Sequence, residues 1–179
     1  GGVFLENESK DFSAGVTSRH ALAVTYQAEA QTMIPEMGSK TFTPGIYRAA
    51  TSINIAANLE VTLDGDNQDH PIFIFQAGTT LTTGANTKIN LINGATADNI
   101  LWAIGTAVTL GANSYIEGSM TTGTAVTMGG LSVVNGCVLA QAAITFPSKA
   151  DVFYTVPSDR RSLAATQVDS AALSAPCPY

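Results

Sequence analysis

Five short segments of this chain repeat one pattern, a small residue followed by an aliphatic residue and then by threonine or asparagine. The aliphatic residues of the five segments are Ile53, Leu81, Val108, Val126 and Ile144. Successive members are 28, 27, 18 and 18 positions apart. A repeat that tolerates insertions is typical of a solenoid, in which each repeat forms one coil and the coils stack. Stacking would superimpose the five segments, so their outward side chains would form one flat array with almost no charge.

Turn residues divide the chain between Lys40 and Val156 into short strands. Glycine and asparagine recur every few residues there, and the segments between them read as strands. Glycines 18 positions apart support a common register: Gly105 and Gly123, Gly111 and Gly129, Gly118 and Gly136. Strands this short exclude a Rossmann or barrel arrangement and suit coils of three strands each. The sequence therefore predicts a mainly β fold, a right-handed, three-faced β-solenoid.

The three predicted faces differ in chemistry, because alternate residues of a strand point to opposite sides. On the first face, inward aliphatic residues alternate with outward threonine, alanine, serine or asparagine. The second face is mixed in size and charge, since Lys88, Tyr115 and Glu117 point outward there. The third face is apolar on both sides, as in residues 72–75 and 100–102, which is typical of strands buried on both faces.

One stretch before these strands differs in composition. Residues 16–33 contain no glycine or proline and are rich in good helix formers. Leu22, Tyr26 and Met33 would form an apolar stripe on such a helix. We predict one long helix at about residues 16–33, packed along the third face, which needs a cover.

Composition narrows the classes of function. Charged residues make up 12% of the chain, about half the usual share, and the formal net charge is −6. The chain has no basic patch, so we expect no nucleic-acid binding. No apolar run approaches the roughly 18 residues that a membrane helix needs, so we expect no membrane span. No signal peptide is visible, which fits a processed, secreted chain and a cytosolic one equally.

The chain has two cysteines, Cys137 and Cys177. A disulfide between them would tether a proline-rich tail and would fit secretion, while two free thiols are the other interpretation. We predict a solenoid domain over residues 1–157 and a C-terminal tail over residues 158–179.

Few residues suggest chemistry. Residues 64–70 concentrate potential metal ligands, but they lack the spacing and the distal glutamate of a helix–loop–helix calcium site, so we interpret them as a solvated loop. His20 and His70, the only histidines, complete no set of base, nucleophile and orienting group. Trp102 and Phe73 lie in apolar strands, so we expect them in the core and not on a sugar-binding platform. We expect no metal, no cofactor and no enzyme activity.

An ordered set of motifs also runs through the chain: Thr43-Pro44-Gly45-Ile46-Tyr47, Leu63-Asp64-Gly65, Ile72-Phe73-Ile74-Phe75-Gln76, Thr80-Leu81-Thr82-Thr83, Asn90-Leu91-Ile92-Asn93-Gly94-Ala95 and Asn99-Ile100-Leu101-Trp102. Together, these motifs resemble those of the microbial ice-binding proteins, which are built on a discontinuous β-solenoid with an accompanying helix. The resemblance covers roughly residues 17–146. It implies a secreted protein that binds the surface of ice crystals through one flat solenoid face.

The resemblance also indicates the site. Several family members carry a Thr-Ala/Gly-x-Thr/Asn motif on the ice-binding face. Residues 106–109 and 124–127 fit this motif in full, and residues 51–54 and 79–82 fit it nearly. Together with the outward positions of the repeats, the motif predicts these ice contacts: Ser52, Asn54, Thr80, Thr82, Thr106, Ala107, Thr109, Thr124, Ala125, Thr127, Ala143 and Thr145.

The predicted array has a spacing and a chemistry that suit ordered water. Stacked strands lie about 4.7–4.9 Å apart, and outward residues two apart in a strand lie about 6.5–7 Å apart. The threonine methyl group orders water, and the hydroxyl group anchors that water by hydrogen bonds. The branched side chain has few rotamers, so the array is preset at little entropic cost. The alternative is that threonine and alanine merely suit outward strand positions.

A different function follows if the solenoid has an open end. Family members usually have a longer segment before the helix, which caps one end, whereas about 15 residues precede the predicted helix here. An uncapped end exposes strand edges and invites self-association. The chain would then be a structural or adhesive subunit that assembles end to end into extracellular fibres. A carbohydrate-binding or carbohydrate-cleaving β-helix is a further alternative.

Overall fold

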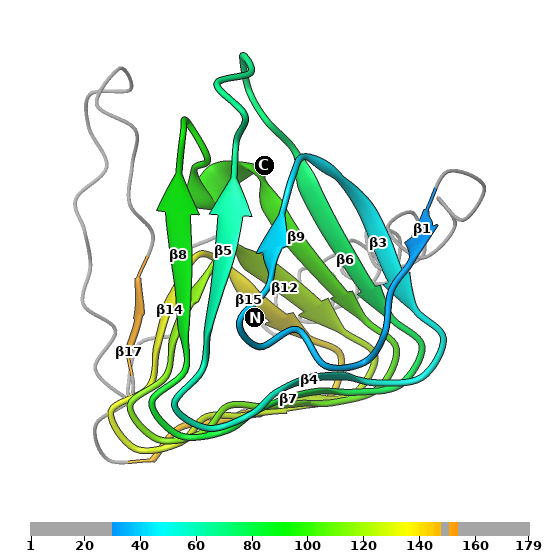
Figure 1. Cartoon of the computed structure of the whole chain (residues 1–179). Coiled ribbons are helices and arrows are strands. Elements are labelled where there is room, and N and C mark those ends of the chain that lie inside the picture. The colour runs from blue at the N-terminus through cyan, green and yellow to red at the C-terminus, as the bar shows by residue number, and fades with distance from the viewer. Residues whose placement is uncertain (1–29, 148–150, 154–179) are drawn as a thin grey trace, which may run out of the picture.

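The computed structural model describes residues 30–147 and 151–153, which form a prism with a triangular cross-section (Figure 1). Each side of the prism is a parallel sheet. Sheet A contains β1 (Gln31–Thr32), β3 (Gly45–Ala49), β6 (Phe73–Ala77), β9 (Ile100–Ile104), β12 (Ser119–Thr122) and β15 (Val138–Ala140). Sheet B contains β4 (Ile53–Ile55), β7 (Leu81–Thr83), β10 (Val108–Thr109), β13 (Ala125–Thr127) and β16 (Ala143–Thr145). Sheet C contains β2 (Thr41–Phe42), β5 (Glu60–Asp64), β8 (Lys88–Ile92), β11 (Tyr115–Glu117), β14 (Val133–Asn135) and β17 (Asp151–Phe153).

In every complete coil the chain passes through sheet A, then sheet B, then sheet C. The strands of each sheet stack in chain order, so consecutive coils are neighbours. The prediction of a mainly β, three-faced solenoid is therefore confirmed for the described residues, where the only helix is the 3₁₀ turn η1 (Ala97–Asn99). The discontinuity that the family resemblance implied stays a prediction, because residues 1–29 and 148–150 lie outside the described residues.

The unequal repeat lengths originate at one corner, where the chain passes from sheet C to sheet A. In the longer repeats, residues 65–72 and 93–99 form loops there, which lie at the top of Figure 1. In the shorter repeats, Gly118 or Gly136 makes a sharp turn instead. Gly118 has a φ of +103°, and a Cβ at this position would lie 2.5 Å from Cγ2 of Ile100, so the turn requires glycine. Because the insertions are confined to this corner, the strands of sheet B keep their register.

Inward side chains from the three sheets form one continuous core. Phe75 stacks between two other aromatic rings, with centroid distances of 5.4 Å to Tyr47 and 4.5 Å to Trp102. Trp102 Nε1 donates a hydrogen bond to the backbone oxygen of Glu117 at 2.9 Å, which satisfies the buried indole. Phe73 and Trp102 are fully buried, so the prediction that they belong to the core is confirmed.

The helix predicted at about residues 16–33 is wrong at its C-terminal end, and its first part lies outside the described residues. Gln31 and Thr32 form β1, which pairs with β3. Met33 N–H then donates a hydrogen bond to the backbone oxygen of Arg48 at 2.9 Å. Pairing at the edge of sheet A thus outweighs the modest helix propensity of these residues.

The outer side of sheet A is largely buried, as the apolar third face predicted. Ile74 and Leu101 are half-buried, and Ala103 is completely buried. Gln76 and Thr121 lie in the same outward row as Ala103 and are also buried, so this side is less apolar than the sequence pattern indicated.

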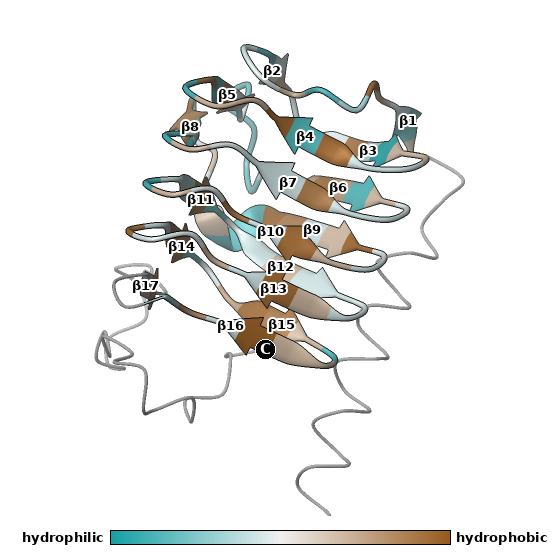
Figure 2. Cartoon of the chain, turned by 90° about the horizontal axis from the view of Figure 1, so that it is seen from below, coloured by the Kyte–Doolittle hydropathy of each residue, from teal (hydrophilic) through white to brown (hydrophobic). Residues whose placement is uncertain are grey.

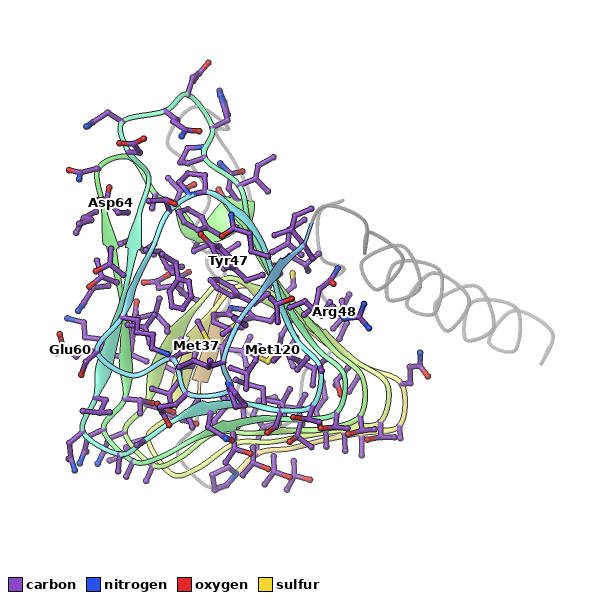
Figure 3. All side chains as sticks on the ribbon, turned by 45° about the vertical axis from the view of Figure 1, so that its right-hand side comes forward. Met37, Tyr47, Arg48, Glu60, Asp64 and Met120 are labelled. Carbon is purple, nitrogen blue, oxygen red and sulfur yellow. The ribbon has the colours of Figure 1, made fainter. Side chains whose placement is uncertain are left out.

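The two ends of the described solenoid differ. At the first coil, Met37 is completely buried and lies over the middle of the triangular section (Figure 3). Its backbone N–H donates to the oxygen of Asn54 at 2.8 Å, which seats this segment on sheet B. In the last coil, by contrast, the inward residues Val138, Ile144 and Val152 are only partly buried. The core is therefore closed at the first coil and less covered at the last.

Candidate functional site

The outer side of sheet B presents the predicted array, and its five strands lie side by side with no described segment in front of them (Figure 2). One row of aligned residues, called here the threonine row, consists of Asn54, Thr82, Thr109, Thr127 and Thr145. The four threonines are exposed, and Asn54 is half-buried. The structure thus brings together threonines from four different coils.

A second outward row lies two residues earlier in the sequence, at or just before the start of each strand. This small row consists of Ser52, Thr80, Ala107, Ala125 and Ala143. Ala143 is exposed and the other four residues are half-buried. Neither row contains a charged residue, so no long charged side chain interrupts the surface.

The rows form a lattice because the backbone is regular. Neighbouring strands of a sheet lie about 4.7–4.9 Å apart, so five strands span about 19 Å along the solenoid. Between the two rows, the inward aliphatic residues anchor each strand to the core. Ile53 and Val126 are completely buried, and Leu81 and Val108 are 1% exposed. The array is therefore fixed from below by packing that leaves little room for displacement.

Tight corners also hold the lattice. Gly78 and Gly105 stack where the chain passes from sheet A to sheet B, and Gly105 N–H donates to the oxygen of Ala77 at 2.9 Å. A Cβ on Gly105 would lie 2.1 Å from the backbone oxygen of Gly78. Consecutive coils thus approach more closely at this corner than any larger residue would permit.

Two of the predicted ice contacts, Thr106 and Thr124, lie at that corner and not in the array. The Oγ1 hydroxyl of Thr106 donates to the backbone oxygen of Thr79 at 2.8 Å, and that of Thr124 donates to the oxygen of Thr106 at 2.7 Å. Among the described residues, the hydroxyls of the threonine row make no such bond. The remaining predicted contacts all lie in the threonine row or the small row.

Sequence reasoning missed an asparagine column at the corner between sheets B and C. Asn58, Asn86 and Asn113 have φ values of 62°, 57° and 54°, a left-handed conformation that asparagine tolerates well. Their amides form a ladder, in which Asn86 Nδ2 donates to Asn58 Oδ1 at 2.9 Å and Asn113 Nδ2 donates to Asn86 Oδ1 at 3.3 Å. The spacings of 28 and 27, shared with the aliphatic residues, were the signal that could have revealed it. Leu131 continues this column with a φ of 61°.

Sheet C offers a different surface. Glu117 is 9% exposed, and Asn135 Nδ2 donates to its Oε2 at 2.8 Å. Burial raises the pKa of Glu117, while the hydrogen bond from Asn135 and the charge of Lys88 oppose this rise. Burial and then the charge of Glu117 raise the pKa of Tyr115. These mixed polar groups confirm the predicted unevenness of the second face, which lacks a repeating lattice of one chemical type.

Hydrogen bonds to the carboxylate of Asp64 stabilise the acidic loop, residues 64–70. Asp64 Oδ1 accepts hydrogen bonds from Asp66 N–H at 2.9 Å and from Asn93 Nδ2 at 2.8 Å. The prediction of a loop between two strands is confirmed. Within residues 30–147 and 151–153, no cluster of three His, Cys, Asp or Glu side chains is arranged to hold a metal ion.

Two further predictions concern a disulfide bond and the absence of a membrane-spanning helix. Cys137 is disulfide-bonded. Its predicted partner, Cys177, lies outside the described residues, so the pairing stays a prediction. In the part of the chain that the structure describes, no helix has the length and apolarity to span a membrane.

Comparisons with known proteins agree with this architecture. A sequence model of the ice-binding-like family matches residues 8–151. An 84-residue match to an ice-binding protein of Flavobacterium frigoris (strain PS1) is 38% identical and covers 47% of this chain and 29% of that protein. An 85-residue match to an ice-binding protein of Lentinula edodes is 42% identical and covers 46% of this chain and 28% of that protein. The matched segment thus spans less than a third of the length of these relatives.

Solved structures show the same fold. The crystal structure of an ice-binding protein from the Antarctic ascomycete Antarctomyces psychrotrophicus superimposes with a TM-score of 0.73 and 28% identity, over 81% of this chain and 70% of that one. A domain of ice-binding protein 1 from Shewanella frigidimarina gives a TM-score of 0.73 and 27% identity, over 80% of this chain and 62% of that one. Because the family model covers more than half of the residues, the chain belongs to the ice-binding-like family.

Proposed function

We propose that this chain adsorbs to ice through the outer side of sheet B and thereby inhibits ice growth or recrystallisation. The observation that carries the proposal is the alignment of four exposed threonines, Thr82, Thr109, Thr127 and Thr145, on adjacent parallel strands. The family membership and the names of the relatives support it.

The physical basis is the addition of many weak contacts on a rigid surface. Each threonine presents a methyl group and a hydroxyl group at a spacing set by the backbone. Alanines of the small row keep the surface between the threonines low. Since the strands are already held by the core and the corners, little conformational entropy is lost on adsorption.

The proposal includes several expectations about the rest of the chain. We expect secretion to the extracellular space and a disulfide between Cys137 and Cys177. We expect right-handed winding and a helix that begins near residue 16 beside sheet A. Adsorption requires no covalent step, so we expect no enzyme activity, no cofactor and no nucleic-acid partner.

Bulky substitutions in the middle of the array test the proposal. Thr109→Tyr or Thr127→Tyr would raise one point of the surface above the rest, so most of the thermal hysteresis should disappear. The circular dichroism spectrum and the melting temperature should stay close to those of the wild type, because both positions are exposed. Thr41→Tyr, at an exposed strand position of sheet C, is the matched control and should keep full hysteresis. Retained activity in both array variants would remove sheet B as the site.

End-to-end assembly into fibres is the second candidate function. It is favoured by the partly exposed inward residues of the last coil, among them Val138, Ile144 and Phe146. The strands of Val138 and Ile144, β15 and β16, also form one edge of sheets A and B within the described part, and such edges invite pairing with another chain. Size-exclusion chromatography and negative-stain microscopy distinguish the two functions, because a monomer supports the ice-binding proposal and fibres support assembly.

A further inference from the structure

The corner between sheets A and B carries a column of threonines that the array does not include. Thr51, Thr79, Thr106 and Thr124 occupy equivalent positions in four successive coils. Backbone hydrogen bonds of 2.7 Å join each to the next, from the N–H of the later residue to the oxygen of the earlier one. All four are exposed. By position and exposure alone they would count as one group.

Their hydroxyls divide them into two groups. Thr106 and Thr124 each donate the Oγ1 hydroxyl to the same backbone oxygen that accepts their N–H, at 2.8 Å on Thr79 and 2.7 Å on Thr106. The buried Thr122 hydroxyl also donates to the oxygen of Thr106. In the described part of the chain, the hydroxyl of Thr79 makes no such bond. Among the described members of this column, a hydroxyl clip is therefore present at two junctions, those made by Thr106 and Thr124.

Those two junctions lie at the centre of the array. The clip at Thr106 joins the coil of β7 to the coil of β10, and the clip at Thr124 joins the coil of β10 to the coil of β13. Each clip is made three residues before a member of the threonine row, Thr109 or Thr127. The clips thus fix the separation of the coils just before β10 and β13, the strands that carry the central threonines.

We propose that Thr106 and Thr124 are positioning residues of the ice-binding face, and that the threonine row and the small row make the contacts with ice. This inference rests on the proposed function. A hydroxyl that already donates to a carbonyl has no proton left to offer to water, whereas the row hydroxyls keep theirs. A positioning residue therefore needs its hydroxyl but not its methyl group, and a contact threonine needs both.

Serine and valine substitutions separate the two roles, because serine removes only the methyl group and valine replaces only the hydroxyl. Thr124→Val should lower thermal hysteresis by at least about twofold, since loosening one strand misplaces its neighbours together. It should also lower the melting temperature by about 2–4 °C, the effect of one lost hydrogen bond. Thr124→Ser should restore both values. Thr127→Ser should lose hysteresis at an unchanged melting temperature.

Thr79→Val is the matched control, because it alters the same corner column without removing a clip. It should change neither hysteresis nor melting temperature. Hysteresis is measured near 0 °C, where every variant is folded, so a purely structural role at position 124 would change the melting temperature alone. That result, or full hysteresis in Thr124→Val, overturns the positioning role.

Two other outcomes are equally clear. Equal loss of hysteresis in Thr124→Ser and Thr124→Val shows that the methyl group touches ice, which makes Thr124 a contact. A wild-type chain without hysteresis overturns the proposed function and this inference with it. The clip is still judged by melting temperature in that case, since Thr124→Val must melt below Thr79→Val if the clip exists.

Discussion

The ring of Phe75 lies almost parallel to the indole of Trp102, with 4.5 Å between the centroids and 19° between the planes. Tyr47 stacks on the other side of Phe75 at 5.4 Å, so three successive coils share one aromatic column inside sheet A. This column links the coils whose other strands carry the array. The stability of the outer face of sheet B therefore depends on packing behind sheet A, another side of the prism.

Removing the middle ring should destabilise the whole solenoid. Phe75→Ala leaves a cavity between two aromatic rings, and such substitutions cost about 3–5 kcal/mol. The chain has a single tryptophan, Trp102, so urea unfolding followed by its fluorescence reports on the site directly. Phe75→Leu should cost less, because it keeps most of the volume. A free energy of unfolding unchanged by Phe75→Ala would show that the column contributes little.

Extending the asparagine column should stabilise the protein. Leu131 adopts a φ of 61°, a left-handed conformation that is unfavourable for leucine. Its side chain is 56% exposed, so little hydrophobic burial offsets that strain. Such a conformation costs most side chains about 1–2 kcal/mol, and asparagine less. Leu131→Asn should therefore gain about 1 kcal/mol in the free energy of unfolding, and it places an amide next to Asn113. Leu131→Ala keeps the strain and should gain nothing, and an equal gain in both variants would refute the argument.

The corner glycines should differ sharply in tolerance. Gly105→Ala puts a methyl group 2.1 Å from the oxygen of Gly78, so the coils must separate, and we expect a loss of more than about 2 kcal/mol. Gly130→Ala is the matched control, since a Cβ there meets nothing within 4 Å. Thermal unfolding of the two variants provides the comparison. Similar melting temperatures would show that the coils at this corner are less closely packed than the structure indicates.

Stability should depend on pH through Glu117. Burial raises its pKa in the folded state above the ordinary value of 4.5, so the folded state holds the proton more tightly than the unfolded state. The stability gained in this way is fully present below that ordinary value and is lost as the pH rises through the folded pKa. Glu117→Gln should remove this dependence and be at least as stable as the wild type at pH 7, because the amide oxygen still accepts from Asn135. Parallel stability curves for the two proteins between pH 4 and pH 8 would contradict this role.

The repeat in the sequence was sufficient to predict the sheet that carries the array. Val108 aligns with Leu81 and with Val126, and Ile53 and Ile144 extend the same row. The prediction succeeded because an inward aliphatic residue in every coil is required by the core, so its period survives the insertions. The chemistry of the outward neighbours then follows from strand alternation.

Other features depended on contacts that no local pattern specifies. The end of the predicted helix was wrong because Gln31 and Thr32 find a partner strand in β3, which is remote in sequence. The hydroxyl clips of Thr106 and Thr124 depend on the orientation of one rotatable group at a corner. Glu117 was predicted to point outward from its strand, yet it is buried. Its burial depends on tertiary packing that the strand pattern does not encode.

Ice-affinity partition is the sharpest test of adsorption through sheet B, because it measures adsorption and not its consequences. A slowly growing ice hemisphere is exposed to wild-type protein, to Thr109→Tyr and to Thr41→Tyr, and the fraction of each that enters the ice is determined. We expect the wild type and Thr41→Tyr to enter the ice while Thr109→Tyr remains in the liquid. Equal entry of Thr109→Tyr and the wild type, or exclusion of the wild type, would contradict adsorption through sheet B.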